Sequence, residues 1–486
     1  MPANIASRTF LRAILALALL SLVGVGPSSS AFRPTNAEAV PPDGYVADFV
    51  STAATGVAMN EAGDVTGTSY LDVGCGPFCL PPLETVVWRG ADRIVLPDIP
   101  GFSDIYVSSI NAQGWVAGFA GFPYTTTHAV VWIPNGNTYQ AIDLGTLPGH
   151  TTSYAVGIDD LGRVVGWSTT SNFPYNGSPF MWSESTGMID LSAQGYPDDT
   201  PLAISPGGAV ATQFTWYLLE DPNSVVTMPS PPQGFGVGTY PTAINDTGDQ
   251  ARFLWSTGPQ NLRYLFRFHH EGTWQQISFT GNGNLAPYGV GSINAAGDVS
   301  ATVLGTGMIA YGPDGLTQSL TPLLSPAYQG SDVTFGGPIT ESGEILAMVM
   351  IGRSQRLMRL TPAQSCTNGC IQVSNLVLRA RFIPDPNDPD HCYENGIMFN
   401  VAKVRLTVTS ETGAPVRRAL VTGRFLDDYW TNEPVSGMTN SSGVVSFPYT
   451  GLCGVGAIAF LVDSVTKGDL VFDRTVGILT DWAIPQ

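Results

Sequence analysis

Short apolar runs alternate with polar, glycine-containing turns along most of the chain, and one such turn occurs seven times. An apolar residue is followed four positions later by glycine in each copy, and these glycines are spaced by 40 to 51 residues. The copies are MNEAGDVTG from Met59, INAQGWVAG from Ile110, IDDLGRVVG from Ile158, ISPGGAVAT from Ile204, INDTGDQAR from Ile244, INAAGDVSA from Ile293 and ITESGEILA from Ile339. A strand-rich repeat of this period predicts the blades of a β-propeller.

The third copy displays the expected internal order of one blade. Apolar runs at 154–158, 163–168, 178–183 and 188–192 are short, rich in Val, Ile, Phe, Met and Trp, and separated by turn residues. They predict four antiparallel strands. In the turn between the first two strands, the Asn, Asp or Ser side chain can accept hydrogen bonds from the following backbone, and the glycine can adopt positive φ. We expect the preceding apolar residue to enter the core.

The seventh copy lacks a fourth strand, whereas the segment YVADFVS at 45–51 precedes the first copy as a strand without a blade. We expect this segment to complete the seventh blade, because closure leaves no exposed sheet edge. The prediction is an all-β chain in which residues 44–362 form a seven-bladed propeller.

The pattern changes after Cys370. Strand-like segments separated by turns follow at 403–426, 439–450, 456–466 and 470–477. Their spacing predicts a β-sandwich over residues 371–486.

The first 31 residues have the layout of a secretory signal peptide. Arg8 and Arg12 precede an uncharged apolar run, and small residues lead to a cleavage position after Ala31. The alternative is a retained anchor, but the run is about 14 residues whereas a spanning helix needs roughly 20. We expect an extracellular or periplasmic protein that does not insert into the membrane after cleavage.

Composition narrows the function classes. Charged residues make up 12% of the chain and the formal net charge is −18. Such a surface disfavours nucleic acids and anionic membranes, because it offers few cations to phosphate groups. Fifty-five glycines and 37 prolines fit strands joined by turns.

Six cysteines in an exported chain indicate disulfides. Fifteen pairings are possible, and we expect Cys75–Cys79, Cys366–Cys370 and Cys392–Cys453. A zinc site at the two C-x-x-x-C pairs is the alternative. It is disfavoured because no histidine lies near either pair, and we expect no metal or other cofactor.

Three further positions contain residue types that can bind metals or act in catalysis, but their patterns are weak indications of a functional site. His128 occupies a position held by Glu84 and Ser178 in neighbouring copies, which favours a packing or rim role. Adjacent His269 and His270 point to opposite faces of a strand, which favours a polar turn over a metal site. The acidic segment 383–396 resembles a Ca²⁺-binding loop in its oxygen ligands, but its prolines favour a solvated turn.

The connections between successive copies are the expected ligand-binding region, because loops on a rigid scaffold commonly carry binding. Tyr106, Tyr154 and Tyr240 share strand alternation with the repeat apolar residue and are expected to pack between blades. The residues expected to reach a ligand at one mouth of the propeller are Asp104, His150, Tyr196, Asp198, Asp199, Tyr328 and Asp332.

The repeat resembles the HAF repeat family of bacterial and archaeal extracellular proteins. The likeness covers about residues 50–360 and is closest at His128–Ala129, Trp132 and the segment DLGTLPG at 143–149. It implies a propeller-like extracellular protein and brings no established chemistry. The order of strands and turns at 371–486 resembles immunoglobulin-like modules of secreted bacterial proteins.

These features favour an exported, monomeric, non-catalytic protein that binds a carbohydrate or an extracellular protein on one propeller face. One alternative is a polysaccharide lyase or a glycosidase, and a glycosidase requires two carboxylates that face each other. Its candidates are Asp104, Asp198, Asp199 and Asp332. A second alternative is a purely structural surface protein.

Overall fold

The computed structural model describes residues 44–485 except 53, 71–82, 103, 122–125, 171–176, 238–242, 258–262, 278–286, 304, 313–315, 329, 364, 384–398, 428–431 and 452–456. Contacts between Cα atoms group residues 41–486 into one compact unit. Apart from three short 3₁₀ turns, every regular element in the described residues is a β-strand, so the all-β prediction is confirmed. None of the described helices has the length and apolarity needed to span a membrane.

Seven antiparallel sheets follow one another along the described part of residues 45–362, and we call them repeat sheets 1 to 7. Repeat sheet 1 contains β2 (Ala54–Met59), β3 (Val65–Tyr70), β4 (Leu83–Arg89) and β5 (Asp92–Val95). Repeat sheet 2 contains β6 (Ile105–Ile110), β7 (Val116–Ala120), β8 (His128–Asn135) and β9 (Thr138–Gly145). Repeat sheet 3 contains β10 (Thr152–Ile158), β11 (Val164–Thr169), β12 (Ser178–Ser183) and β13 (Gly187–Asp190).

In the next three sheets the strands again follow one another along the chain, but repeat sheet 5 has five strands instead of four. Repeat sheet 4 follows the 3₁₀ turn η1 (Ser192–Gln194) and contains β14 (Ala203–Ile204), β15 (Ala209–Ala211), β16 (Thr215–Leu218) and β17 (Asp221–Thr227). Repeat sheet 5 contains β18 (Phe235–Val237), β19 (Ala243–Ile244), β20 (Gln250–Ser256), β21 (Arg263–His269) and β22 (Thr273–Ile277). Repeat sheet 6 contains β23 (Pro287–Ile293), β24 (Val299–Val303), β25 (Thr306–Tyr311) and β26 (Leu316–Ser319).

Repeat sheet 7 joins the two ends of this series. The 3₁₀ turns η2 (Thr321–Leu323) and η3 (Pro326–Tyr328) lead into β27 (Asp332–Ile339), β28 (Ile345–Ile351) and β29 (Ser354–Pro362), and β1 (Tyr45–Ser51) adds the fourth strand. β1 pairs with β29 from Tyr45 opposite Pro362 to Ser51 opposite Leu357. The predicted completion of the seventh sheet by residues 45–51 is therefore confirmed.

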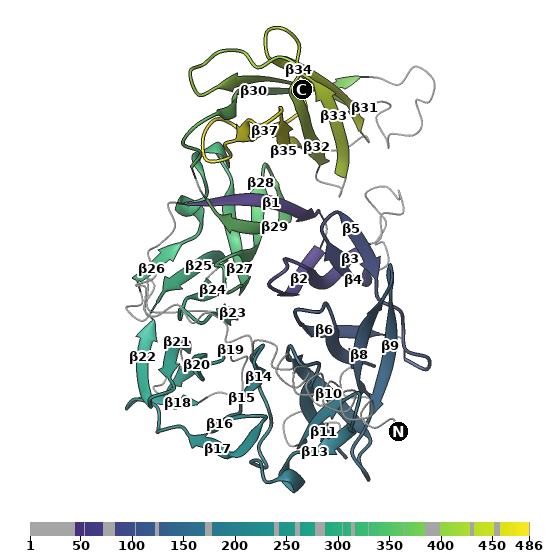
Figure 1. Cartoon of the computed structure of the whole chain (residues 1–486), viewed down its shortest axis with the longest axis vertical. Helices are drawn as coiled ribbons and strands as arrows, with labels where there is room; N and C mark the ends of the chain where they lie inside the picture. Colours follow the sequence, from purple (N-terminus) through teal and green to yellow (C-terminus); the bar gives the residue numbers. More distant parts are fainter. Residues whose placement is uncertain are drawn as a thin grey trace, which may run out of the picture. The chain divides into compact units, whose positions relative to one another are not determined.

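The first strands of the repeat sheets lie around a common centre (Figure 1). Contacts run from β2 to β6, β10, β14, β19, β23 and β27 in turn, and from β27 back to β2. The cycle of neighbours is closed, so each of the seven sheets packs against a sheet on both sides. This gives every apolar sheet face a partner that buries it.

The recurring turn has the predicted local structure. All seven turn glycines have φ between 76° and 90°, a region that residues with a Cβ rarely adopt. The side-chain oxygen of Asn60 accepts the backbone N–H of Ala62 at 3.1 Å and that of Asp64 at 2.9 Å. Asn111, Asp159 and Asn245 make the same two bonds in their copies.

The same turns also bond to one another across the sheets, which the sequence did not predict. Asn60 donates its side-chain amide to the Asn111 carbonyl, and Asn111 donates to the Asp159 carbonyl, both at 2.9 Å. Asn245 reaches the Asn294 carbonyl at 3.0 Å in the same way. We call the seven turns and the bonds between them the turn belt.

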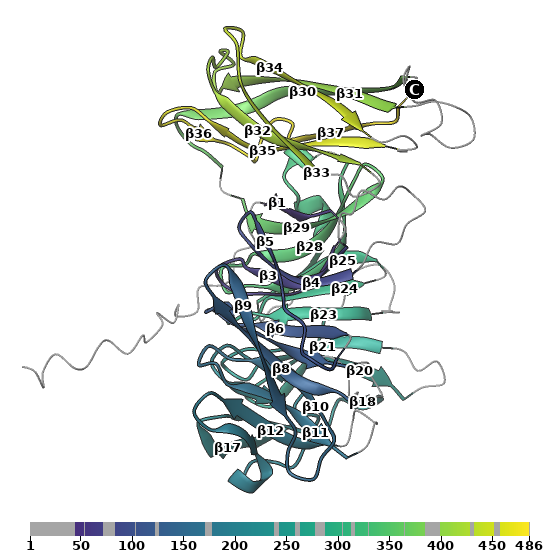
Figure 2. The same ribbon diagram turned by 90° about the vertical axis from the view of Figure 1, so that its right-hand side faces the viewer.

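Two four-stranded sheets follow Cys370, and we call them the C-terminal sheets. One contains β34 (Val444–Gly451), β31 (Phe399–Ser410), β30 (Cys370–Ile383) and β36 (Val471–Phe472), in that order. The other contains β33 (Asn432–Met438), β32 (Leu420–Asp427), β35 (Ile458–Thr466) and β37 (Thr480–Ala483). They stack as two layers (Figure 2) over a core that includes Phe425, Phe447, Tyr449 and Phe460.

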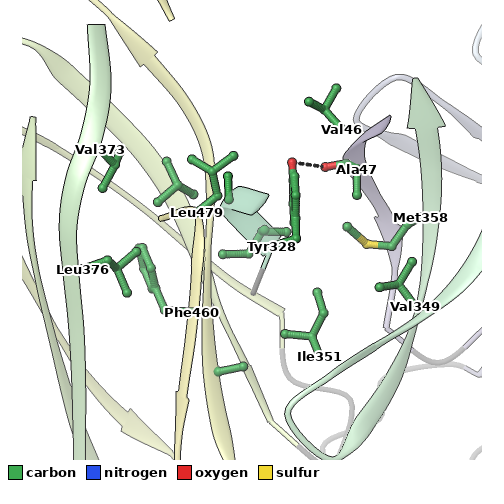
Figure 3. Close-up of a cluster of buried hydrophobic side chains, with 14 of the residues drawn as sticks. Val46, Ala47, Tyr328, Val349, Ile351, Met358, Val373, Leu376, Phe460 and Leu479 are labelled. Carbon is green, nitrogen blue, oxygen red and sulfur yellow. Dashed lines mark hydrogen bonds between the residues drawn. The ribbon is translucent and has the colours of Figure 1, made fainter. Parts of the chain in front are cut away.

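Repeat sheet 7 and the C-terminal sheets share one hydrophobic core. Met358 and Ile351 of repeat sheet 7 belong to the same buried cluster as Leu479 and Phe460 (Figure 3). Tyr328 lies within it and donates its hydroxyl to the carbonyl of Ala47 in β1 at 2.9 Å. The described residues thus place no solvent layer between these two groups of strands.

Two arginines from the C-terminal part hold β1. Arg474 donates to the carboxylate of Asp48 and the carbonyl of Ala47, both at 2.7 Å. The guanidinium of Arg424 lies 4.1 Å from the ring centre of Phe49. β1 is therefore held by backbone hydrogen bonds to β29 and by contacts of these two cations with Asp48, Phe49 and the Ala47 carbonyl.

Of the predicted disulfides, Cys366–Cys370 is confirmed. Cys75, Cys79, Cys392 and Cys453 lie outside the described residues. The predicted signal peptide at 1–31, Tyr240 and most of the acidic segment 383–396 also lie outside them.

The Arg474 contacts yield a stability prediction. Replacing Arg474 with Met leaves Asp48 and the Ala47 carbonyl without these donors, so we expect a loss of about 2–3 kcal/mol in unfolding free energy. Urea unfolding measures the loss, and amide hydrogen exchange is expected to accelerate in 45–51 while β10–β13 stay protected. The matched control is Arg417→Met, which removes an exposed arginine of the same part. Equal unfolding midpoints for both variants would contradict the role assigned to Arg474.

Candidate functional site

Two of the predicted ligand-binding residues lie close to the start of β27, and they differ in exposure to solvent. Tyr328 is 2% exposed in the core described above. The expectation that Tyr328 is accessible is wrong, because η3 directs the ring beneath β1 instead of toward solvent. Asp332 is exposed at the start of β27, where it stands opposite Met350 of β28.

In the connection before repeat sheet 4, Tyr196 packs against the sheet and is less accessible than predicted. Tyr196 is half-buried, with its ring centre 4.9 Å from that of Tyr217, and its hydroxyl donates to the Leu219 carbonyl at 2.7 Å. These contacts tie repeat sheet 3 to repeat sheet 4. Asp198 is exposed, and half-buried Asp199 accepts the Phe214 N–H at 3.4 Å.

Asp104 and His150 are half-buried in two further connections. The Asp104 carbonyl accepts the Gly121 N–H at 2.8 Å, and the His150 N–H donates to Leu147 at 3.0 Å. The first bond extends the pairing of β6 with β7 in repeat sheet 2, and the second lies within the connection between repeat sheets 2 and 3. The predicted set of seven residues is thus distributed over four connections, and none of the seven lines the groove described below.

Tyr106, Tyr154 and His128, for which the sequence favours packing roles, make packing contacts in the structure. Tyr106 stacks on Phe119, Phe119 contacts Tyr154, and Tyr154 stacks on Trp167, with ring centres 4.1 to 5.1 Å apart. This row of rings links repeat sheets 2 and 3. His128 pairs with Asp143 at 2.9 Å beside the ring of Phe102.

Carboxylates occupy several positions in the turn belt. Glu61 accepts the Glu341 N–H at 2.8 Å, and Glu341 accepts the Ala295 N–H at 2.7 Å. Asp160 and Asp246 accept the turn N–H groups of the preceding sheets at 2.8 and 2.7 Å. With the amide bonds and the bond from the Asp160 N–H to the Pro206 carbonyl, all seven junctions between repeat sheets are bridged.

These carboxylates also repel one another. Loss of hydration raises the pKa of Glu61, and the charges of Glu344 and Asp160 raise it further, although backbone N–H donors oppose the change. The pKa values of Asp160 and Glu341 are raised for the same reasons, burial first and neighbouring carboxylates second. Because each carboxylate bonds to backbone of an adjacent sheet, the turn belt is explained by closure of the sheets. Within the described residues, no cluster of three or more metal-binding side chains occurs.

A groove of about 620 Å³ opens between repeat sheets 1 and 7. Strands β2, β3 and β4 supply one wall, with Thr55, Thr68, Tyr70 and Leu83 among its residues. The other wall is formed by β28, β29 and the turn between them, and includes Met348, Met350, Arg353, Ser354, Gln355 and Arg356. The volume falls in the range of small-molecule sites, roughly 300–1,000 Å³.

The groove combines apolar surface with hydroxyl groups. Tyr70 and Leu83 are 40% and 57% exposed and give the groove its accessible apolar surface. Arg356 is buried and donates to the carbonyls of Gln355 and Asp427, whereas Arg353 is exposed. Among the described residues of the lining there is no Asp or Glu, although the chain has 39 acidic residues.

The groove escaped the sequence analysis because strand ends about 280 positions apart form it. The available signals were weak: Met348 and Met350 alternate in β28, and Tyr70 and Leu83 end and begin neighbouring strands. Neither signal identifies the opposite wall. Only closure of the sheets brings β28 and β29 beside β2 and β3.

No family model and no curated protein matches the chain. Solved structures similar to the chain include a fungal alcohol oxidase in complex with copper, at 11% identity and a TM-score of 0.34, covering 91% of this chain and 98% of that one. The extracellular domain of a putative one-component system from B. thetaiotaomicron is 11% identical with a TM-score of 0.30, covering 90% and 69%. One of two prolyl endopeptidases described together is 10% identical with a TM-score of 0.36, covering 82% and 60%.

The turn belt predicts a pH dependence of stability. A carboxyl group whose pKa is raised on folding binds its proton more tightly in the folded state, so its contribution is present at acidic pH and is lost as the pH rises through the raised pKa. We expect Glu61→Gln to weaken this loss, because the amide oxygen still accepts the Glu341 N–H but carries no charge.

The measurement is the unfolding midpoint in urea between pH 4 and pH 8. Glu61→Gln is expected to gain stability relative to the parent as the pH rises. Glu184→Gln, an exposed carboxyl in repeat sheet 3, removes the same charge and serves as the control. A constant difference between Glu61→Gln and the parent across this range would contradict the assignment.

Proposed function

We propose that the seven repeat sheets are the blades of a seven-bladed β-propeller and that the C-terminal sheets are an immunoglobulin-like module. The closed cycle of first strands and the four-stranded order of six of the seven sheets support the propeller. The two stacked sheets with an aromatic core support the module. The likeness of the repeat to HAF repeats agrees with this architecture.

We propose further that the protein acts outside the cytoplasm. The Cys366–Cys370 disulfide is stable in an oxidising compartment, and the basic, apolar and small-residue segments at 1–31 match an export signal.

Our central proposal is that the protein is a non-catalytic carbohydrate-binding protein whose site is the groove between repeat sheets 1 and 7. The observation that carries it is the pairing of exposed Tyr70 with a wall of hydroxyl side chains in a groove of about 620 Å³. An aromatic ring packs against the C–H face of a sugar, while Thr55, Thr68 and Ser354 offer hydroxyl donors and acceptors to sugar hydroxyls.

The composition of the groove favours binding over hydrolysis. A glycosidase places two carboxyl groups on either side of the scissile bond, about 5 to 10 Å apart. The lining residues that the structure describes include neither an Asp nor a Glu. The carboxylates with raised pKa belong to the turn belt, where their oxygens accept backbone N–H groups.

Removal of the Tyr70 ring tests the site. A glycan array identifies a bound saccharide, and calorimetry then compares the parent with Tyr70→Ala. We expect a loss of about 2 kcal/mol, or roughly thirtyfold in affinity, because an aromatic anchor is removed from the groove. The melting temperature of Tyr70→Ala is measured beside its affinity, so that a loss of binding is separated from a loss of folding.

Phe214→Ala provides the matched control, since Phe214 is 54% exposed and belongs to repeat sheet 4. This variant is expected to bind the saccharide as the parent does. Equal affinity of Tyr70→Ala and the parent would move the site away from the groove.

A further inference from the structure

The described lining of the groove carries positive charge, whereas the protein as a whole is acidic. The chain has a formal net charge of −18, yet the described residues that line the groove include two arginines and no carboxylate. Arg353 makes no hydrogen bond or ion pair with any described residue, whereas Arg356 is held by backbone carbonyls. Arg356 thus serves the fold, whereas Arg353 is exposed at the groove.

The position of Arg353 follows from the turn that carries it. Gly352, at φ 66°, forms a tight two-residue connection between β28 and β29, which pair directly at Ile351 and Ser354. Both strands contribute buried residues to the core of repeat sheet 7, so the turn rests on a fixed base. A guanidinium on such a turn presents a planar pair of donors that matches the two oxygens of a carboxylate.

We propose that the saccharide recognised by the groove is an acidic one, with a carboxylate of the uronic acid class bound by Arg353. This inference rests on the proposed carbohydrate-binding function and specifies its ligand. Tyr70 packs against a sugar ring while Arg353, on the opposite wall, pairs with the carboxylate of the ring or of its neighbour.

Two nearby acidic groups bear on the strength of this pairing. Asp332 stands opposite Met350, a lining residue, and cross-strand partners point to the same face, so its charge borders the groove. Asp427 lines a small adjacent recess with Arg353, but it is buried and accepts the Tyr449 hydroxyl at 3.2 Å. More distant carboxylates are screened within about 8 Å at physiological ionic strength.

The test uses matched acidic and neutral probes with the full mature chain. The probes are oligogalacturonates, oligoalginates and hyaluronan oligosaccharides, each compared with the same saccharide after methyl esterification of its carboxyl groups. We expect at least one acid to bind the parent, and its ester to bind at least tenfold more weakly. We expect Arg353→Gln to abolish this difference and Arg353→Lys to retain part of it, because lysine keeps the charge without the planar donor pair.

Two further variants test whether the effect is specific to Arg353 and whether the neighbouring negative charge opposes binding. Arg379→Gln removes an exposed arginine from β30 and is expected to leave binding unchanged. Asp332→Asn removes the bordering negative charge and is expected to tighten binding of the acid but not of its ester.

The outcomes separate the two proposals. If acid and ester bind the parent equally, or if neutral saccharides alone bind in a Tyr70-dependent manner, the acidic ligand is wrong and the carbohydrate site stands. If Arg353→Gln preserves the tenfold preference, Arg353 is not the recognising group. If no saccharide of either kind binds, both proposals fail.

Discussion

Closure between the first and last strands of the repeat series is the constraint on which the rest of the structure depends. An open series would leave β29 without its partner strand and the facing sides of repeat sheets 1 and 7 uncovered, and such exposed edges and apolar faces promote aggregation. The pairing of β1 with β29 satisfies the backbone of β29, and the packing of β27 against β2 covers the facing sides. The groove exists only because this closure places sheets from opposite ends of the series side by side.

In several of the recurring turns, one asparagine side chain makes hydrogen bonds both within its own turn and to the next turn. An asparagine oxygen accepts N–H groups within its own turn, and the amide nitrogen of the same side chain bonds to the turn of the next sheet. Aspartate, as at Asp159, performs the first job and lacks the donor for the second, and there the neighbouring Asp160 N–H bridges to the next turn. Closure therefore depends on the polar residues of the turn as well as on the apolar ones.

The sequence predicted those parts of the fold that depend on local pattern. The four strands of repeat sheet 3, the positive φ of Gly162 and the completion of repeat sheet 7 by residues 45–51 follow from period, turn chemistry and a count of strands. The groove could not be predicted in this way, because residues far apart in the sequence form its two walls. Tyr328 is in a connection with turn-forming residues, yet Leu479 and Ala47 from the two ends of the chain enclose it.

The bonds from Arg474 to β1 have a consequence for biogenesis. Arg474 follows Asp48 by 426 residues, and β29 follows β1 by about 300. At 5–20 residues per second, roughly 15–60 s separate synthesis of β1 from synthesis of its partner strand, and the final fastening waits still longer. During that interval β1 is an apolar strand with two free edges. The pairing of β1 with β29 and its bonds to Arg474 therefore form only after most of the chain has been synthesised.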